Sequence, residues 1–239
     1  MGFMPNAAAA MRPPQARSTH ARMSGDDRRR QLIEVAIDLF SRKGFGGTTT
    51  KEIAAAAGVT EAIIFRHFAT KQDFYKAILD YKVAESGAEE WMAGAEAFMR
   101  RNDDAGLFRF LVAKIIEIYR EDTRFERLLM HAALEGNELA IMHHSRFAEP
   151  IGMKFKEYIR KRQAEGAIRE CDPGIVLMAL AGIPQFYAMR KYVYSPCDFA
   201  CSDEEVIDTF MTLLMDGLRN GAERKPPKRR ITGKAGKRK

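Results

Sequence analysis

TTTKEIAAAAGVTEAIIFRHFATK, residues 48–71, decides the fold of this chain, because it predicts two short helices joined by a tight turn. Thr49 and Glu52 have the spacing of a capping box, which starts the first helix before an alanine run that propagates it. Gly58 can take a positive φ and end that helix. Thr60 can then cap the second helix, which carries Glu61 in its first turn. This is the pattern of a helix-turn-helix, whose second helix enters the major groove of DNA. A plain helical hairpin in a globular core is the alternative.

The side chains of this stretch divide into an apolar inner set and a mixed outer set. We expect the inner surface to consist of Ile53, Ala54, Ala57, Val59, Ile64 and Phe68. The outer face is expected to carry Thr60, Glu61, Ala62, Ile63, Phe65, Arg66 and His67. The outer set is therefore the candidate reading surface.

A longer segment, GFGGTTTKEIAAAAGVTEAIIFRHFATKQDFYKAIL, resembles the DNA-binding domain of the TetR family of bacterial transcriptional regulators. The residues at that family's characteristic spacings are Gly44, Phe45, Thr49, Ile53, Ala54, Gly58, Val59, Phe68, Lys71 and Phe74. The family usually has a tyrosine, whose hydroxyl commonly contacts a phosphate, where this chain has Phe65. Phe65 lacks that hydroxyl, although it can press on a sugar or a thymine methyl group.

The candidate DNA contacts fall into two classes. Side chains and helix N-terminal amides are expected to hold phosphates at Thr50, Thr60, His67 and Lys71. The candidate base readers are Glu61, Ala62, Ile63 and Arg66. Glu61 suits a cytosine amine, Arg66 suits guanine, and the two apolar side chains suit thymine methyl groups.

The net charge of +7 is unevenly distributed. Residues 224–239 hold nine Lys and Arg residues and no acid, so the rest of the chain is slightly acidic. We expect residues 223–239 to be a disordered basic tail that adds nonspecific phosphate attraction or solubility. Residues 1–25 are expected to be a disordered arm, in which Arg12, Arg17 and Arg22 suit a minor groove.

The remaining pattern predicts an all-α protein of about nine helices. The expected domains are a three-helix helix-turn-helix domain at residues 26–72 and a helical effector-binding and dimerisation domain at residues 73–222. Beyond the reading unit we expect helices near 70–100, 123–135, 138–164, 173–194 and 203–220, and one that begins near 104 and includes Ile118. Ser86-Gly87 and Gly94 are candidate breaks in the first of these, and Pro150 and Gly152 in the fourth.

The body is rich in large adaptable side chains, and the family resemblance implies a small-molecule pocket there. The candidate lining residues are Trp91, Phe98, Phe110, Lys114, His131, Glu135, Phe147, Met178 and Gln185. For any one aromatic residue, plain core packing is the alternative.

The order of the last helices also resembles the C-terminal half of that family, in which two helices of each subunit form a four-helix bundle. The apolar residues that suit this interface are Ile175, Val176, Leu180, Ile183, Val206, Phe210, Leu213 and Leu214. Burial within one subunit is the alternative.

The sequence contains no pattern typical of a disulfide-stabilised protein, a metal-binding protein, an enzyme or a membrane protein. Three cysteines, with Cys197 and Cys201 four residues apart, are too few for a disulfide scaffold or a zinc site, and they favour a reducing, cytoplasmic location. Neither a phosphate loop nor a nucleophile elbow nor a zinc-protease motif occurs, so we expect no catalytic residue, metal or cofactor. No apolar run has transmembrane length.

The sequence thus predicts a ligand-responsive, homodimeric DNA-binding regulator, with operator DNA, a second copy and a small effector as partners. A repressor released from a palindromic operator by an apolar or amphipathic effector is the leading hypothesis. A ligand-independent architectural DNA-binding protein is the alternative, with the basic tail supplying its affinity.

Overall fold

The structure is a computed structural model that describes residues 23–194 and 200–219. The arm arginines Arg12, Arg17 and Arg22, the basic tail and Cys197 lie outside these residues. The described part is helical, with a single isolated β-bridge between Ile168 and Arg219 and no strand. None of its helices has both the length and the apolar composition that crossing a bilayer requires.

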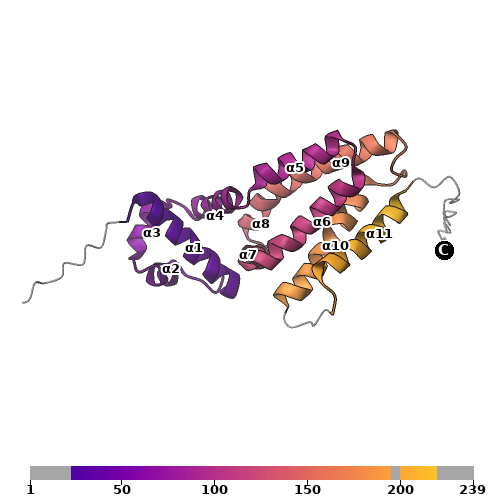
Figure 1. Ribbon diagram of the computed structural model, residues 1–239. Helices are drawn as coiled ribbons and strands as arrows, with labels where there is room; N and C mark the ends of the chain where they lie inside the picture. Colours follow the sequence, from indigo (N-terminus) through magenta and orange to yellow (C-terminus); the bar gives the residue numbers. More distant parts are fainter. Residues whose placement is uncertain (1–22, 195–199, 220–239) are drawn as a thin grey trace, which may run out of the picture.

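Four helices form the reading head at one end of the molecule (Figure 1). They are α1 (Gly25–Lys43), α2 (Thr50–Ala56), α3 (Glu61–His67) and α4 (Lys71–Glu85). Ile37, Ile53 and Ile78 are at most 1% exposed at the centre of the head core. The periodic apolar residues of α1 and α4 thus close over the inner face of the two short helices.

Five further helices form the body around a second core (Figure 1). They are α5 (Ala88–Arg100), α6 (Asp104–Glu121), α9 (Glu149–Ala164), α10 (Pro173–Ala188) and α11 (Asp203–Leu218). α6 packs against α5, α10 and α11. Phe108, Phe155 and Leu180 are fully buried there.

Two helices from the middle of the chain join the head rather than the body core. α7 (Arg124–Leu134) packs against α1, and α8 (Glu138–His143) packs against α4. Leu128, Ala132 and Leu139 are fully buried in the head core. The apolar packing therefore continues across the expected domain boundary at residue 72.

The expected helix over residues 70–100 is divided into two, and the candidate break at Ser86-Gly87 is confirmed. Gly87 has a φ of 59°, a left-handed conformation that glycine adopts without steric cost, and it separates α4 from α5. Gly94 does not break α5. Its missing side chain leaves room for Phe110, because a Cβ atom there would lie 3.0 Å from the ring.

The interruption of the helix over 138–164 is also placed differently from the expectation. A π-helical turn, η1 (His144–Ala148), precedes Pro150, whereas Gly152 lies inside α9. Proline lacks an amide hydrogen and its ring crowds the carbonyl four residues earlier, so a widened turn relieves the conflict. A second π-helical turn, η2 (Met189–Val193), follows Pro184 in α10. With these divisions, the described residues contain eleven α-helical segments rather than about nine.

The burial on α9 gives a stability prediction. Phe155→Ala removes a ring that is fully buried in the body core, so the free energy of unfolding should fall by about 3–5 kcal/mol in urea denaturation. Met153→Ala is the matched control, because Met153 lies on the same helix and is 43% exposed. Its effect should stay within about 0.5 kcal/mol. Equal losses in the two variants would contradict the orientation of α9.

Candidate nucleic-acid interface and effector site

The turn between α2 and α3 has the hydrogen bonds of a Schellman motif. Gly58 has a φ of 69°, and its amide donates to the carbonyl of Ala55 at 3.1 Å. The Val59 amide donates to the carbonyl of Ala54 at 2.9 Å. These two bonds satisfy the end of α2 and fix the direction in which α3 leaves.

The expected capping box is confirmed at the start of α2. The Glu52 amide donates to the Thr49 hydroxyl at 3.2 Å, and the Glu52 carboxylate accepts from the Thr49 amide at 3.0 Å. The expected cap at Thr60 is wrong: its backbone is extended, but its side chain makes no capping hydrogen bond. The exposed Thr60 hydroxyl is thus left available for a contact outside the chain.

Most of the candidate reading residues lie on an open face of α3. Ala62, Phe65 and Arg66 are exposed, and Phe65 is 59% exposed, which is unusual for a phenyl ring. Ile63 is half-buried and packs against the head core. Lys71 is exposed at the first turn of α4, where its ammonium group lies 5.5 Å from the centre of the Tyr75 ring. The face thus carries apolar and basic groups side by side.

Glu61 is less free than the sequence suggested. Its carboxylate accepts a hydrogen bond from the Thr50 hydroxyl, which joins the first turn of α3 to the first turn of α2. The sequence predicts DNA contacts for both side chains. In this structure they satisfy each other and hold the two N-termini together.

Arg29 is a head residue whose specific role the sequence did not reveal. Its guanidinium donates to the main-chain carbonyl of His67 at 2.6 Å and lies 4.5 Å from the centre of the Phe68 ring. It therefore fastens the C-terminal end of α3 to α1. The run Arg28–Arg30 signals positive charge on α1, but it does not indicate which arginine points inward.

His67 offers a neutral ring rather than a positive charge at pH 7. Burial lowers the pKa of its imidazole, and the charges of Arg66 and Arg29 lower that pKa further. A polar hollow of about 400 Å³ adjoins this ring. It is lined by Arg29, Arg66, His67, Ala69, Asp73, Lys76, Ala77 and Asp80.

Three of the candidate effector residues come together in the body. The Trp91 and Phe110 rings stack with centroids 6.0 Å apart, and the Phe98 and Phe110 centroids are 5.5 Å apart. Phe155 lies beneath Trp91 at 6.2 Å. The Trp91 indole nitrogen is buried without a hydrogen-bond partner in the described structure, so it is a donor with unused capacity.

The other six candidates are dispersed. Lys114 pairs with Glu117 at 3.1 Å, and the Gln185 amide donates to the Tyr119 hydroxyl at 3.3 Å. Phe147 packs against the head core, and Met178 is 72% exposed on α10. His131 and Glu135 lie at the end of α7, where both side chains approach the loop after α1.

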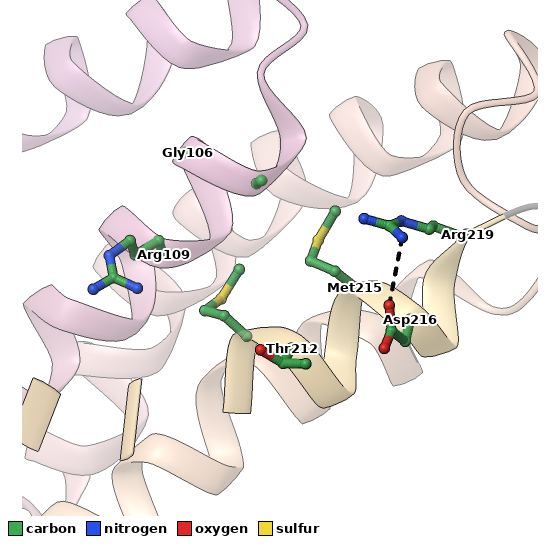
Figure 2. Close-up of a pocket in the computed structure, with 8 residues that line it drawn as sticks. Gly106, Arg109, Thr212, Met215, Asp216 and Arg219 are labelled. Carbon is green, nitrogen blue, oxygen red and sulfur yellow. Dashed lines mark ion pairs between the residues drawn. The ribbon is translucent and has the colours of Figure 1, made fainter. Parts of the chain in front are cut away.

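The sequence did not identify a groove between the start of α6 and the end of α11. It has a volume of about 390 Å³ and is open to solvent. Figure 2 shows Gly106 and Arg109 on one wall and Thr212, Met215, Asp216 and Arg219 on the other. None of the expected effector residues lines this groove, whose walls come from elements about 100 residues apart in the chain.

The expected dimer residues divide into exposed and buried sets. Ile175, Ile183 and Leu213 are between 52% and 70% exposed. Val176, Leu180 and Phe210 are buried within the subunit, and Val206 and Leu214 are half-buried. Met178 and Phe186 extend the exposed set, so α10 presents an apolar stripe with a helical period.

Metal-binding groups are dispersed in the described part of the chain. No three His, Cys, Asp or Glu side chains there are gathered as ligands. Cys171 and Cys201 are free thiols.

Comparisons with known proteins agree with this geometry. Residues 32–78 match the family model described as bacterial regulatory proteins, tetR family. YvkB of Bacillus subtilis, an HTH-type transcriptional regulator, is 41% identical over 59 residues, which are 25% of this chain and 31% of YvkB. NicS of Pseudomonas putida, an HTH-type transcriptional repressor, is 26% identical over an alignment of 226 residues that covers 88% of this chain and 100% of NicS. This chain therefore spans about a third of YvkB and all of NicS.

A solved structure shares the fold. AibR in complex with isovaleryl coenzyme A and operator DNA aligns with a TM-score of 0.60 at 22% identity, over 79% of this chain and 98% of that one. The segment matched by the family model begins in α1 and ends in α4, so it contains the whole helix-turn-helix. The helix-turn-helix segment of this chain, residues 32–78, therefore carries the sequence pattern of bacterial regulatory proteins of the tetR family.

Proposed function

We propose that this regulator is a homodimeric repressor that leaves a palindromic operator when a small apolar or amphipathic effector binds in the body. The observation that carries the proposal is the open face of α3, with Phe65 and Arg66 exposed and Lys71 at its edge. A face of this kind has no packing role within the subunit. A base-paired duplex supplies both the phosphates and the base edges that it suits.

The proposed division of labour follows the exposure of each side chain. Arg66 donates to a guanine, and Ala62 and Phe65 meet thymine methyl groups or sugars. Thr60 and Lys71 hold phosphates, and His67 contributes a neutral N–H group. Glu61 and Thr50 act mainly by fixing α3 against α2, because each already has the other as a partner.

The proposed dimer uses the apolar stripe of α10 together with Leu213 of α11. Ile175, Met178 and Ile183 are all more than half exposed, which is costly for a monomer in water. Packing of α10 and α11 against the same helices of a second copy would cover them. Two heads related by a two-fold axis would then suit a palindromic operator.

The proposed effector site is the aromatic cluster of Trp91, Phe98 and Phe110. Flat apolar rings with one unused N–H donor suit an apolar molecule that carries a hydrogen-bond acceptor. AibR, which shares this fold and whose structure contains both isovaleryl coenzyme A and operator DNA, supports the proposal of a small-molecule effector. The effector can change DNA affinity only to the extent that it binds one conformation of the dimer, with one spacing of the two heads, more tightly than another.

The phosphate role of Lys71 predicts a change in salt dependence. The probe is a duplex selected from a random library by the wild-type protein. Lys71→Ala should weaken binding to all sequences and reduce the slope of log affinity against log salt by about 0.9 for each lost contact. Lys154→Ala, which removes a body lysine paired with Glu96, is the control. An unchanged slope in Lys71→Ala would rule out a phosphate contact there.

The dimer proposal predicts a change in mass. Ile183→Asp places a charge in the stripe and should convert a particle of twice the 27.0 kDa chain mass into a monomer in light scattering. Ile141→Asp is the matched control, because Ile141 is 68% exposed on α8, away from the stripe. A dimer that survives Ile183→Asp, or a monomeric wild type, would contradict this interface.

The effector site can be probed through the single tryptophan of the chain. Titration with the apolar dye 8-anilinonaphthalene-1-sulfonate should quench Trp91 emission in a saturable manner. Phe110→Ala should weaken dye binding by about 5- to 10-fold, because it removes an aromatic wall. Tyr194→Ala, at a side chain that is 58% exposed outside the cluster, should leave binding unchanged. Saturable dye binding without quenching would place the site elsewhere.

A further inference from the structure

The loop between α1 and α2 is held by a side chain from a distant part of the sequence. The Glu135 carboxylate accepts from the Phe45 amide at 3.1 Å through Oε1 and from the Gly46 amide at 2.8 Å through Oε2. Both oxygens are thus used, one for each amide. Hydrogen bonds to an ionised carboxylate are stronger than bonds to a neutral acceptor.

The loop is closely fitted to this carboxylate. Gly44 has a φ of 71°, and a Cβ atom there would lie 2.2 Å from Glu135 Oε1. Phe45 is buried, with its ring 4.3 Å from the Phe40 ring centroid and 5.2 Å from that of Tyr75. The adjacent titratable group is His131, whose Nδ1 lies 3.9 Å from Oε1.

Glu135 is itself anchored to α7. Its amide donates to the His131 carbonyl at 2.9 Å, and Gly136 with a φ of 64° then reverses the chain. The next residue, Asn137, donates from its side-chain amide to the Tyr75 hydroxyl at 2.9 Å. The carboxylate therefore sits at a helix end that cannot move without moving the contacts around it.

These contacts attach the head at both ends of the helix-turn-helix. α4 follows α3 directly along the chain, whereas Glu135 holds the loop that leads into the capping box of α2. If the head were joined to the body only through α4, it could rotate about that connection. A second contact prevents this rotation. α7 begins three residues after α6, so it links this second contact to the body.

We propose that Glu135 is a positioning residue that sets the orientation of the reading head by clamping the amides of Phe45 and Gly46 to α7. The inference rests on the proposed function, since the orientation matters through the spacing of two DNA-bound heads. A movement of α7 relative to α4 would shift the start of α2 through these hydrogen bonds, in addition to any movement that α4 transmits. His131 and Glu135 then belong to the coupling between body and head rather than to an effector pocket.

The test compares full-length wild type, Glu135→Gln and the control Glu96→Gln, which removes a body carboxylate paired with Lys154. The first measurement is amide hydrogen exchange, which requires no DNA. Glutamine has one acceptor oxygen instead of two, so exchange at Phe45, at Gly46 or at both should accelerate by about tenfold or more in Glu135→Gln alone. Wild-type exchange at both amides in that variant would overturn the clamp.

The second measurement is selection from duplex libraries in which two half-sites are separated by a variable spacer. Wild type and Glu96→Gln should select one spacer length, and Glu135→Gln should accept several. A Glu135→Gln variant that has a lower thermal midpoint but keeps the wild-type spacer preference would show a purely structural role and overturn the positioning role. If Glu135→Gln folds poorly, Glu135→Asp keeps the charge but shortens the reach, and it should broaden spacing to a smaller extent. A wild type that selects no duplex would reject the proposed function, and the exchange result would still decide the clamp.

Discussion

The burial of α7 against α1 is the contact on which the arrangement of head and body depends. Leu128 and Ala132 have no exposed surface, and they lie in the core that α1 and α4 form around the helix-turn-helix. Apolar burial is strong but non-directional, so it brings α7 to the head without fixing its rotation. The carboxylate of Glu135 and the hydrogen bond from Asn137 to Tyr75 supply the direction.

Because of this packing, residues that lie far along the chain from the helix-turn-helix belong to the head core. The segment that matches the family model ends at residue 78, whereas the core it belongs to also contains Leu128 and Leu139. Gly87 marks a real break in the main chain, but not a break in the packing. The head is therefore completed by residues contributed from what the sequence alone assigns to the body.

The sequence predicted the features that depend on neighbouring residues. The capping box at Thr49 and the turn at Gly58 follow from local hydrogen bonding and local backbone geometry, and both are confirmed. The exposure of Phe65 and Arg66 follows from the helical period once the turn is known. Such features need no knowledge of distant packing.

The features that were missed depend on distant partners. The sequence places Glu135 among the candidate residues of an effector pocket, but its hydrogen-bond partners lie about 90 residues earlier. The sequence predicts Glu61 to be a base reader, but the crossing of α2 and α3 brings Thr50 to its carboxylate. No local pattern encodes either contact. Thr60 shows the reverse case, since its sequence context suits a cap that the side chain does not make.

The π-helical turn at His144–Ala148 has a consequence for how one long helix serves two cores. α8 before it places Leu139 in the head core, and α9 after it places Phe155 in the body core. Each residue of an α-helix advances the side-chain direction by roughly 100°, and a π turn absorbs one additional residue. The turn therefore rotates the side chains of α9 about the helix axis relative to those of α8. The one additional residue in the turn sets the angle between the face of α8 in the head core and the face of α9 in the body core.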